Sequence, residues 1–81
     1  MSPAGNADDV ANRVRELRMV HGQTQEELGH ATGLTRQSII AIEKGRFTPS
    51  VQTALRLARA LETSVDHLFW LTADVKNGAQ S

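Results

Sequence analysis

Side chains that suit the edges of DNA bases gather in the segment 36–44. At helical spacing, the residues that share the face opposite Ile39 and Ile42 are Arg36, Gln37, Ile40, Ala41 and Lys44. An arginine can pair with O6 and N7 of guanine, and a glutamine can pair with N6 and N7 of adenine. Ile40 suits the methyl group of thymine, or else it belongs to the margin of the core. Base contacts are therefore predicted for the first four of these residues, the alternative being an ordinary solvated helix face.

A second group of side chains suits phosphate: Gln25, Thr35, Ser38, Lys44 and Arg46. Gln25 stands at the start of an expected helix, where free backbone N–H groups and the helix dipole favour an anion. Phosphate contacts position a protein on a duplex without reading its sequence, and they make binding sensitive to salt. The alternatives are a first-turn polar residue for Gln25 and a free surface charge for Arg46.

The charge distribution is compatible with a nucleic-acid partner. The chain has 81 residues and a formal net charge of zero. Residues 12–59 carry eight basic against four acidic side chains, and the flanks hold the compensating acidic excess. A basic centre between acidic ends fits a nucleic-acid face, although an excess of four charges is weak evidence by itself.

Two short helices joined by a tight turn must position these side chains. Thr24 and Glu27 form a capping box, from which a helix runs to Gly33. Thr35 caps the next helix, and Gly45 ends it. A small residue, Gly29, lets the two helices cross closely, and Gly33 permits the positive φ of the turn. The residues expected to bury this crossing are Leu28, Leu34, Ile39 and Ile42.

Three further helices complete an expected all-α, compact five-helix domain. The first is capped by Asp8 or Asp9, carries apolar residues at 10, 14 and 17, and ends at Gly22. Ser50 caps the fourth helix, whose broad apolar stripe comprises Val51, Ala54, Leu55, Leu57, Ala58 and Leu61. The fifth begins at Thr63 or Ser64 and carries Val65, Leu68 and Phe69. No segment alternates as a strand would.

The expected boundaries follow from these elements. A flexible arm covers residues 1–8, the DNA-binding domain covers 9–71, and a tail covers 72–81.

Four segments resemble the Cro/CI-type (Xre) helix-turn-helix regulators, which are lambda-repressor-like. They are NRVRELR at 12–18, QEEL at 25–28, TRQSI at 35–39 and AIEKGR at 41–46. With TPS at 48–50 and SVDHLF at 64–69, the similarity covers roughly residues 12–69. It implies a dimeric, sequence-specific DNA binder, a DNA-backbone contact by Gln25, and a structural ion pair between Arg18 and Glu43. The alternative for Glu43 is a solvated carboxylate beside Lys44.

Gln23 departs from the family pattern, which usually has an apolar residue just before the capping threonine. A core contact is expected to be missing there unless Met19 or Val20 fills the gap. We expect reduced stability and an unchanged fold.

No enzyme, metal site or cofactor is expected. The chain has no cysteine, and its three histidines are too scattered for a helical pair of metal ligands. It has no glycine-rich phosphate loop, and Glu26 and Glu27 are adjacent, so they do not face each other across a cleft. The apolar run at 68–71, which no other run exceeds in length, is far too short to cross a bilayer. A cytoplasmic protein is expected, without membrane contact and without an evident small-molecule effector.

Trp70 and Leu71 add more apolar surface than the last turn of a five-helix domain needs. Such a patch on a small domain usually marks an interface, so both are predicted to contact a second copy of the chain. The alternative is that they fold back over the monomer.

These observations predict a sequence-specific transcriptional regulator, expected to be a repressor. It would bind double-stranded DNA as a homodimer on a pseudo-palindromic operator. The rival prediction is a protein-interaction module, an antitoxin or adaptor, that keeps the helix pair as a scaffold.

Overall fold

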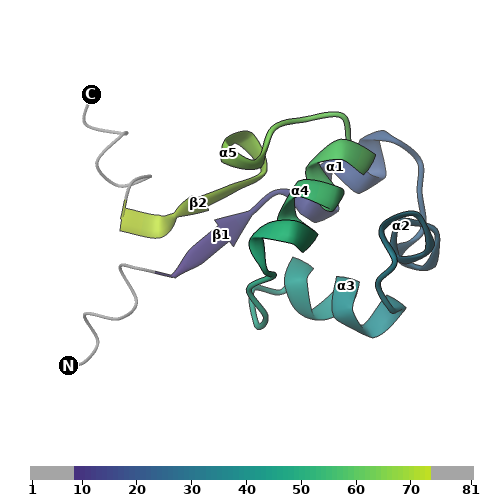
Figure 1. Ribbon diagram of the computed structural model, residues 1–81, viewed down its shortest axis with the longest axis horizontal. Coiled ribbons are helices and arrows are strands. Elements are labelled where there is room, and N and C mark those ends of the chain that lie inside the picture. Colours follow the sequence, from purple (N-terminus) through teal and green to yellow (C-terminus); the bar gives the residue numbers. More distant parts are fainter. Residues whose placement is uncertain (1–8, 74–81) are drawn as a thin grey trace.

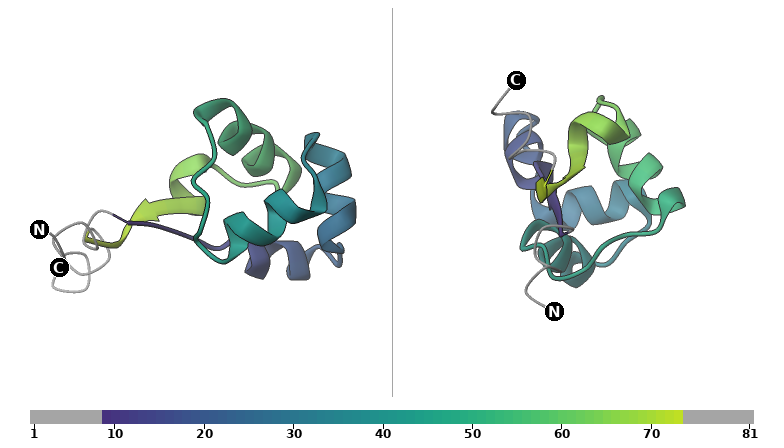
Figure 2. Two further views of the ribbon diagram at one scale, coloured as in Figure 1. Left: turned by 90° about the horizontal axis from the view of Figure 1, so that it is seen from below. Right: turned by 90° about the vertical axis from the view of Figure 1, so that its left-hand side faces the viewer.

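The computed structural model describes residues 9–73, in which five helices and two short strands follow one another. The helices are α1 (Val14–Val20), α2 (Gln25–Thr32), α3 (Arg36–Glu43), α4 (Val51–Ala60) and α5 (Val65–Leu68). Strands β1 (Val10–Asn12) and β2 (Phe69–Leu71) pair antiparallel, and they project from one side of the helical body (Figures 1 and 2). The expected compact five-helix domain is confirmed, and a small two-stranded sheet that was not expected is added to it.

The two expected flanking segments fall largely beyond this region. The arm over residues 1–8 and most of the tail over 72–81 lie outside the described residues. Between residues 9 and 73, no helix has the length and apolar character needed to cross a membrane.

The helix pair α2–α3 begins and ends as predicted. Thr24 Oγ1 accepts a hydrogen bond from the Glu27 backbone N–H at 3.0 Å, and Glu27 Oε1 accepts from the Thr24 N–H at 2.8 Å. Gly33 ends α2 with a φ of +75°, which is costly for any residue with a Cβ. Thr35 Oγ1 then accepts from the Ser38 backbone N–H at 3.0 Å and caps α3. Local side-chain chemistry thus sets both helix starts.

Gly29 allows the close approach of these two helices. The Gly29 carbonyl accepts from the Leu34 N–H at 2.8 Å, and a Cβ at position 29 would lie 2.6 Å from the Leu34 carbonyl oxygen. That separation is far inside van der Waals contact. A larger residue would therefore push the turn, and α3 with it, away from α2.

The core lies where all five helices meet. Its large, completely buried side chains come from every helix: Val14, Leu28, Ile39, Ile42, Leu57 and Leu68. Leu61, Ala54 and Ala58 extend it along α4. Val51 and Leu55 were expected in the same stripe, but both are exposed. The buried stripe is narrower than expected and consists of residues 54, 57, 58 and 61. Val51 and Leu55 lie beside that stripe.

The strand pair corrects two predicted helix boundaries. Val10 pairs with Leu71 in the sheet, so α1 does not start at a cap on Asp8 or Asp9. It begins at Val14, whose backbone N–H donates to Asn12 Oδ1 at 3.0 Å. Phe69 likewise belongs to β2, and α5 ends at Leu68. Backbone pairing between the two ends of the domain supplies the hydrogen bonds that further helical turns would have made.

Gln23 lies at the position where the family pattern usually has an apolar residue. Met19 and Val20, the two residues expected to fill it, are both exposed. Among residues 9–73, the buried Oε1 atom of Gln23 has no hydrogen-bond partner. The Gln23 side chain therefore buries a polar atom, Oε1, that forms no hydrogen bond within the described part of the chain.

Candidate nucleic-acid interface

Helix α3 divides its residues between the core and the surface. Ile39 and Ile42 are completely buried, whereas Arg36 and Gln37 in the first turn are exposed. The residues predicted to contact bases therefore share the outward side of α3, with Ile40 and Ala41 half-buried behind Arg36 and Gln37. In a helix docked in a major groove, the first turn is the part that contacts base edges.

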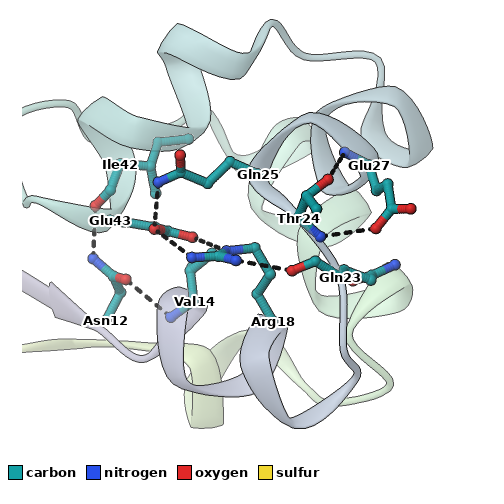
Figure 3. A network of polar contacts seen from close by, with 9 residues as sticks. All are labelled: Asn12, Val14, Arg18, Gln23, Thr24, Gln25, Glu27, Ile42 and Glu43. Carbon is teal, nitrogen blue, oxygen red and sulfur yellow. Dashed lines mark hydrogen bonds and ion pairs between the residues drawn. The ribbon is translucent and has the colours of Figure 1, made fainter.

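Side chains from α1 and α2 hold the last residue of α3 (Figure 3). Arg18 on α1 donates from Nε to Glu43 Oε2 at 2.7 Å and from Nη2 to Oε1 at 3.4 Å. Gln25, the first residue of α2, donates from Nε2 to Glu43 Oε1 at 3.1 Å. The Glu43 side chain is only 4% exposed, so these donors offset the cost of burying its charge. The ion pair fixes α3 against α1.

Asn12 holds the same end of α3 from the strand side. Its Nδ2 donates to the Ile42 carbonyl at 2.9 Å, and its Oδ1 accepts from the Val14 N–H at 3.0 Å (Figure 3). One side chain thus accepts from the first N–H of α1 and ties β1 to α3. This role of Asn12 was not predicted. Asn before a helical run is a detectable cap signal, but the contact with α3 arises only from tertiary packing.

A hollow of about 500 Å³ opens beside the start of α2. Its lining comes from α1, the turn after it, α2 and the first residue of α3: Arg15, Arg18, Gly22, Gln23, Thr24, Gln25, Glu26 and Arg36. Because Arg18 is engaged by Glu43 and the Gln23 carbonyl, the guanidinium groups of Arg15 and Arg36 remain beside the helix N-terminus, together with the Glu26 carboxylate. Two such groups close to a helix N-terminus favour an anion. Arg15 joins the candidate phosphate contacts here. This contact was not predicted, because only the fold places this exposed α1 residue beside α2.

The predicted phosphate contacts flank the outward face of α3. Thr35 and Ser38 lie at its start, where the Thr35 hydroxyl donates to Ser38 Oγ at 3.0 Å. Lys44 and Arg46 are exposed just beyond its end. Gln25 lies on the hollow described above, although its Nε2 is engaged by Glu43. The fold therefore gathers the base-contact and phosphate-contact candidates on one side of the molecule.

A smaller hollow of about 190 Å³ lies on α3 itself. It is lined by Gln37, Ile40, Ala41, Lys44 and Arg46, so an apolar floor is bordered by polar and cationic side chains. This hollow joins the outward face of α3 to the turn that follows the helix.

Trp70 and Leu71 lie apart from α3, on the projecting sheet. Alternation along the strands places Leu71 on the same face as Val10 and Phe69, and Trp70 on the opposite face. The guanidinium carbon of Arg13 lies 4.9 Å from the centroid of the Trp70 ring, and Trp70 is half-buried. Leu71 is 42% exposed. An apolar groove of about 210 Å³, lined in part by Val10 and Phe69, opens on the face that carries Leu71.

The described residues offer no metal centre. Within residues 9–73, no three His, Cys, Asp or Glu side chains come close enough together to hold a metal ion.

Comparisons with known proteins agree with this geometry. A family model described as helix-turn-helix matches residues 14–68. An uncharacterized HTH-type transcriptional regulator from Bacillus subtilis, YgzD, is 45% identical over 62 residues, which cover 76% of this chain and 94% of that protein. Another from Methanothermobacter thermautotrophicus is 50% identical over 62 residues, or 75% and 90% of the two chains.

The chain is also similar in three-dimensional structure to a protein whose structure has been solved. The restriction-modification controller protein C.AhdI from Aeromonas hydrophila matches with a TM-score of 0.64 and 36% sequence identity. The match covers 68% of this chain and 83% of the controller.

Proposed function

Because this chain belongs to the helix-turn-helix family of DNA-binding transcriptional regulators, we propose that it is a sequence-specific repressor. It binds as a homodimer to a pseudo-palindromic operator. The observation that carries this proposal is the outward face of α3, where Arg36 and Gln37 are exposed in the first turn while Ile39 and Ile42 anchor the helix in the core.

Base recognition is assigned to the first turn of α3 and the residues behind it. Arg36 pairs with guanine, because its guanidinium group can donate two hydrogen bonds, to O6 and N7. Gln37 pairs with adenine, because its side-chain amide can donate to N7 and accept from the N6 amino group. Ile40 and Ala41 contact bases through apolar atoms. The ion pair between Arg18 and Glu43 keeps α3 at a fixed angle to the body, so these contacts form without further ordering of the helix.

Phosphate contacts on both sides of α3 set its register in the groove. Gln25, Arg15, Thr35 and Ser38 contact one stretch of backbone near the start of α3, and Lys44 and Arg46 contact another beyond its end. Such contacts supply affinity for any duplex, which base readout then converts into preference for one sequence.

The dimer forms through the projecting sheet. Leu71 is exposed beside an apolar groove, and Trp70 lies on the other face of β2. Two-fold symmetry would then place two α3 helices in successive major grooves, about 34 Å apart. A dimer bound in this way excludes other proteins from the same stretch of duplex, which is the simplest route to repression.

Selection from random duplex DNA tests this function. Purified protein is incubated with the pool near physiological salt, and bound molecules are amplified through several rounds and sequenced. The expected result is a two-fold symmetric site with half-sites one helical turn apart. Absence of any enriched sequence, from protein shown to be folded by circular dichroism, would contradict the proposal and favour the protein-interaction module.

A further inference from the structure

The smaller hollow, on α3, is lined in part by apolar side chains. Apolar side chains are not needed to recognise bases by hydrogen bonds. The floor of the hollow is formed by Ile40 and Ala41, two apolar side chains that remain half-buried on a surface otherwise suited to polar base edges. The core uses the neighbouring Ile39 and Ile42, both completely buried, so Ile40 is not needed to anchor the helix. An apolar floor at this position calls for an apolar occupant.

The major groove of DNA displays a single kind of apolar group. Guanine, adenine and cytosine show only hydrogen-bonding atoms there, whereas thymine adds a methyl group on C5. Cytosine shows the same group only when it is methylated at C5. We therefore infer that the hollow lined by Ile40 and Ala41 is a reader of the C5-methyl group of a pyrimidine. This inference rests on the proposed function.

The rim of the hollow fixes where that pyrimidine lies. Lys44 and Arg46 border one side and are exposed, as groups that contact phosphate must be. Gln37 borders the other side, one helical turn before Ala41. The methyl-bearing base therefore lies between the backbone held by these cations and the base read by Gln37, in each half-site.

The test begins with the operator returned by the selection. At each thymine, that base is replaced in turn by uracil, which removes only the C5-methyl group. At one thymine per half-site the replacement is expected to weaken binding about fourfold, the value of one buried methyl group. Cytosine and 5-methylcytosine at the same position form a second pair of duplexes, in which methylation is expected to restore a similar factor.

A variant protein assigns the effect to the hollow. In Ile40→Ala the preference for thymine over uracil is expected to disappear, because the floor no longer reaches the methyl group. Ile40→Ser, which replaces the apolar side chain by a polar one without a methyl group, provides a second variant if Ile40→Ala is poorly folded. Lys44→Ala is the matched control on the same hollow. It should bind all duplexes more weakly while its thymine preference stays unchanged.

The outcomes separate this inference from the proposed function. A thymine preference that both Ile40 variants lose supports the inference. If the duplex with 5-methylcytosine binds no more tightly than the duplex with cytosine, the site reads the methyl group of thymine alone. An operator without any uracil-sensitive thymine, or a preference that persists in both variants, overturns the methyl reader while leaving DNA binding intact. Failure to select any operator overturns both.

Discussion

At the scale of single residues, Gln23 is a local defect with a measurable cost. Its Oε1 atom is buried without a hydrogen-bond partner among the described residues, while its backbone carbonyl accepts from Arg18 Nη1 at 2.8 Å. Gln23→Leu removes the unpaired oxygen and keeps the backbone contact. It is expected to raise the free energy of unfolding by about 1 kcal/mol, the usual penalty for such a group. Urea unfolding followed by circular dichroism measures the change.

The control for Gln23→Leu is Gln52→Leu, which makes the same substitution at an exposed position on α4. Its effect should stay within about 0.5 kcal/mol. Equal effects of the two substitutions would mean that the unpaired oxygen carries no penalty.

Arg46 is a residue for which we propose a purely electrostatic contribution to DNA binding. It is exposed beyond the end of α3, on the rim of the smaller hollow. Arg46→Ala is expected to weaken binding to operator and random duplexes by the same factor, because a phosphate contact carries no sequence information. The slope of log affinity against log salt should fall in magnitude by about 1. Titrations at several salt concentrations test this, and a selective loss on the operator would show that Arg46 reads bases instead.

At the scale of elements, the orientation of α3 depends on contacts made far from its outward face. Arg18 and Gln25 hold Glu43, and Asn12 holds the Ile42 carbonyl. The last residues of α3 lead directly into Lys44 and Arg46. Small movements at this end are therefore expected to shift the surface that we propose faces DNA.

Asn12→Asp isolates one of these contacts. The carboxylate still accepts from the Val14 N–H and favours the start of α1, but it can no longer donate to the Ile42 carbonyl. The free energy of unfolding should fall by about 1 to 3 kcal/mol, because the Ile42 carbonyl loses its donor and faces a carboxylate oxygen. Operator affinity should fall as well, because a displaced α3 places its base contacts less accurately. Affinity for random duplex should stay the same.

Asn12→Ala serves as the comparison, because it removes both hydrogen bonds and should lose stability as well. If Asn12→Asp lost operator and random binding equally, Asn12 would have no role in positioning α3.

At the scale of the whole molecule, the projecting sheet is the element through which we propose that two copies of the chain associate. Leu71→Glu places a charge on an exposed apolar position of β2 and is expected to convert the proposed homodimer to monomer. Sedimentation equilibrium measures this directly. Met19→Glu changes an exposed apolar residue of α1 and is expected to leave the dimer intact. A Leu71→Glu protein that remains dimeric would move the interface away from β2.

How much of this architecture could be predicted depends on the range of the interactions. The α2–α3 pair was predictable, because the capping box at Thr24 and the turn at Gly33 are set by residues within a few positions of each other. The strands were not, because three-residue segments alternate too briefly and pair only when both ends of the domain meet. The role of Asn12 and the hollow on α3 likewise depend on tertiary packing.

The central claim is that α3 reads base edges through Arg36. The most direct measurement compares wild-type and Arg36→Ala affinities for the selected operator and for a scrambled duplex at one salt concentration. The account predicts a loss of about 1 to 3 kcal/mol on the operator and a much smaller loss on the scrambled duplex. Equal losses on both duplexes would contradict it, because Arg36 would then be contacting only phosphate.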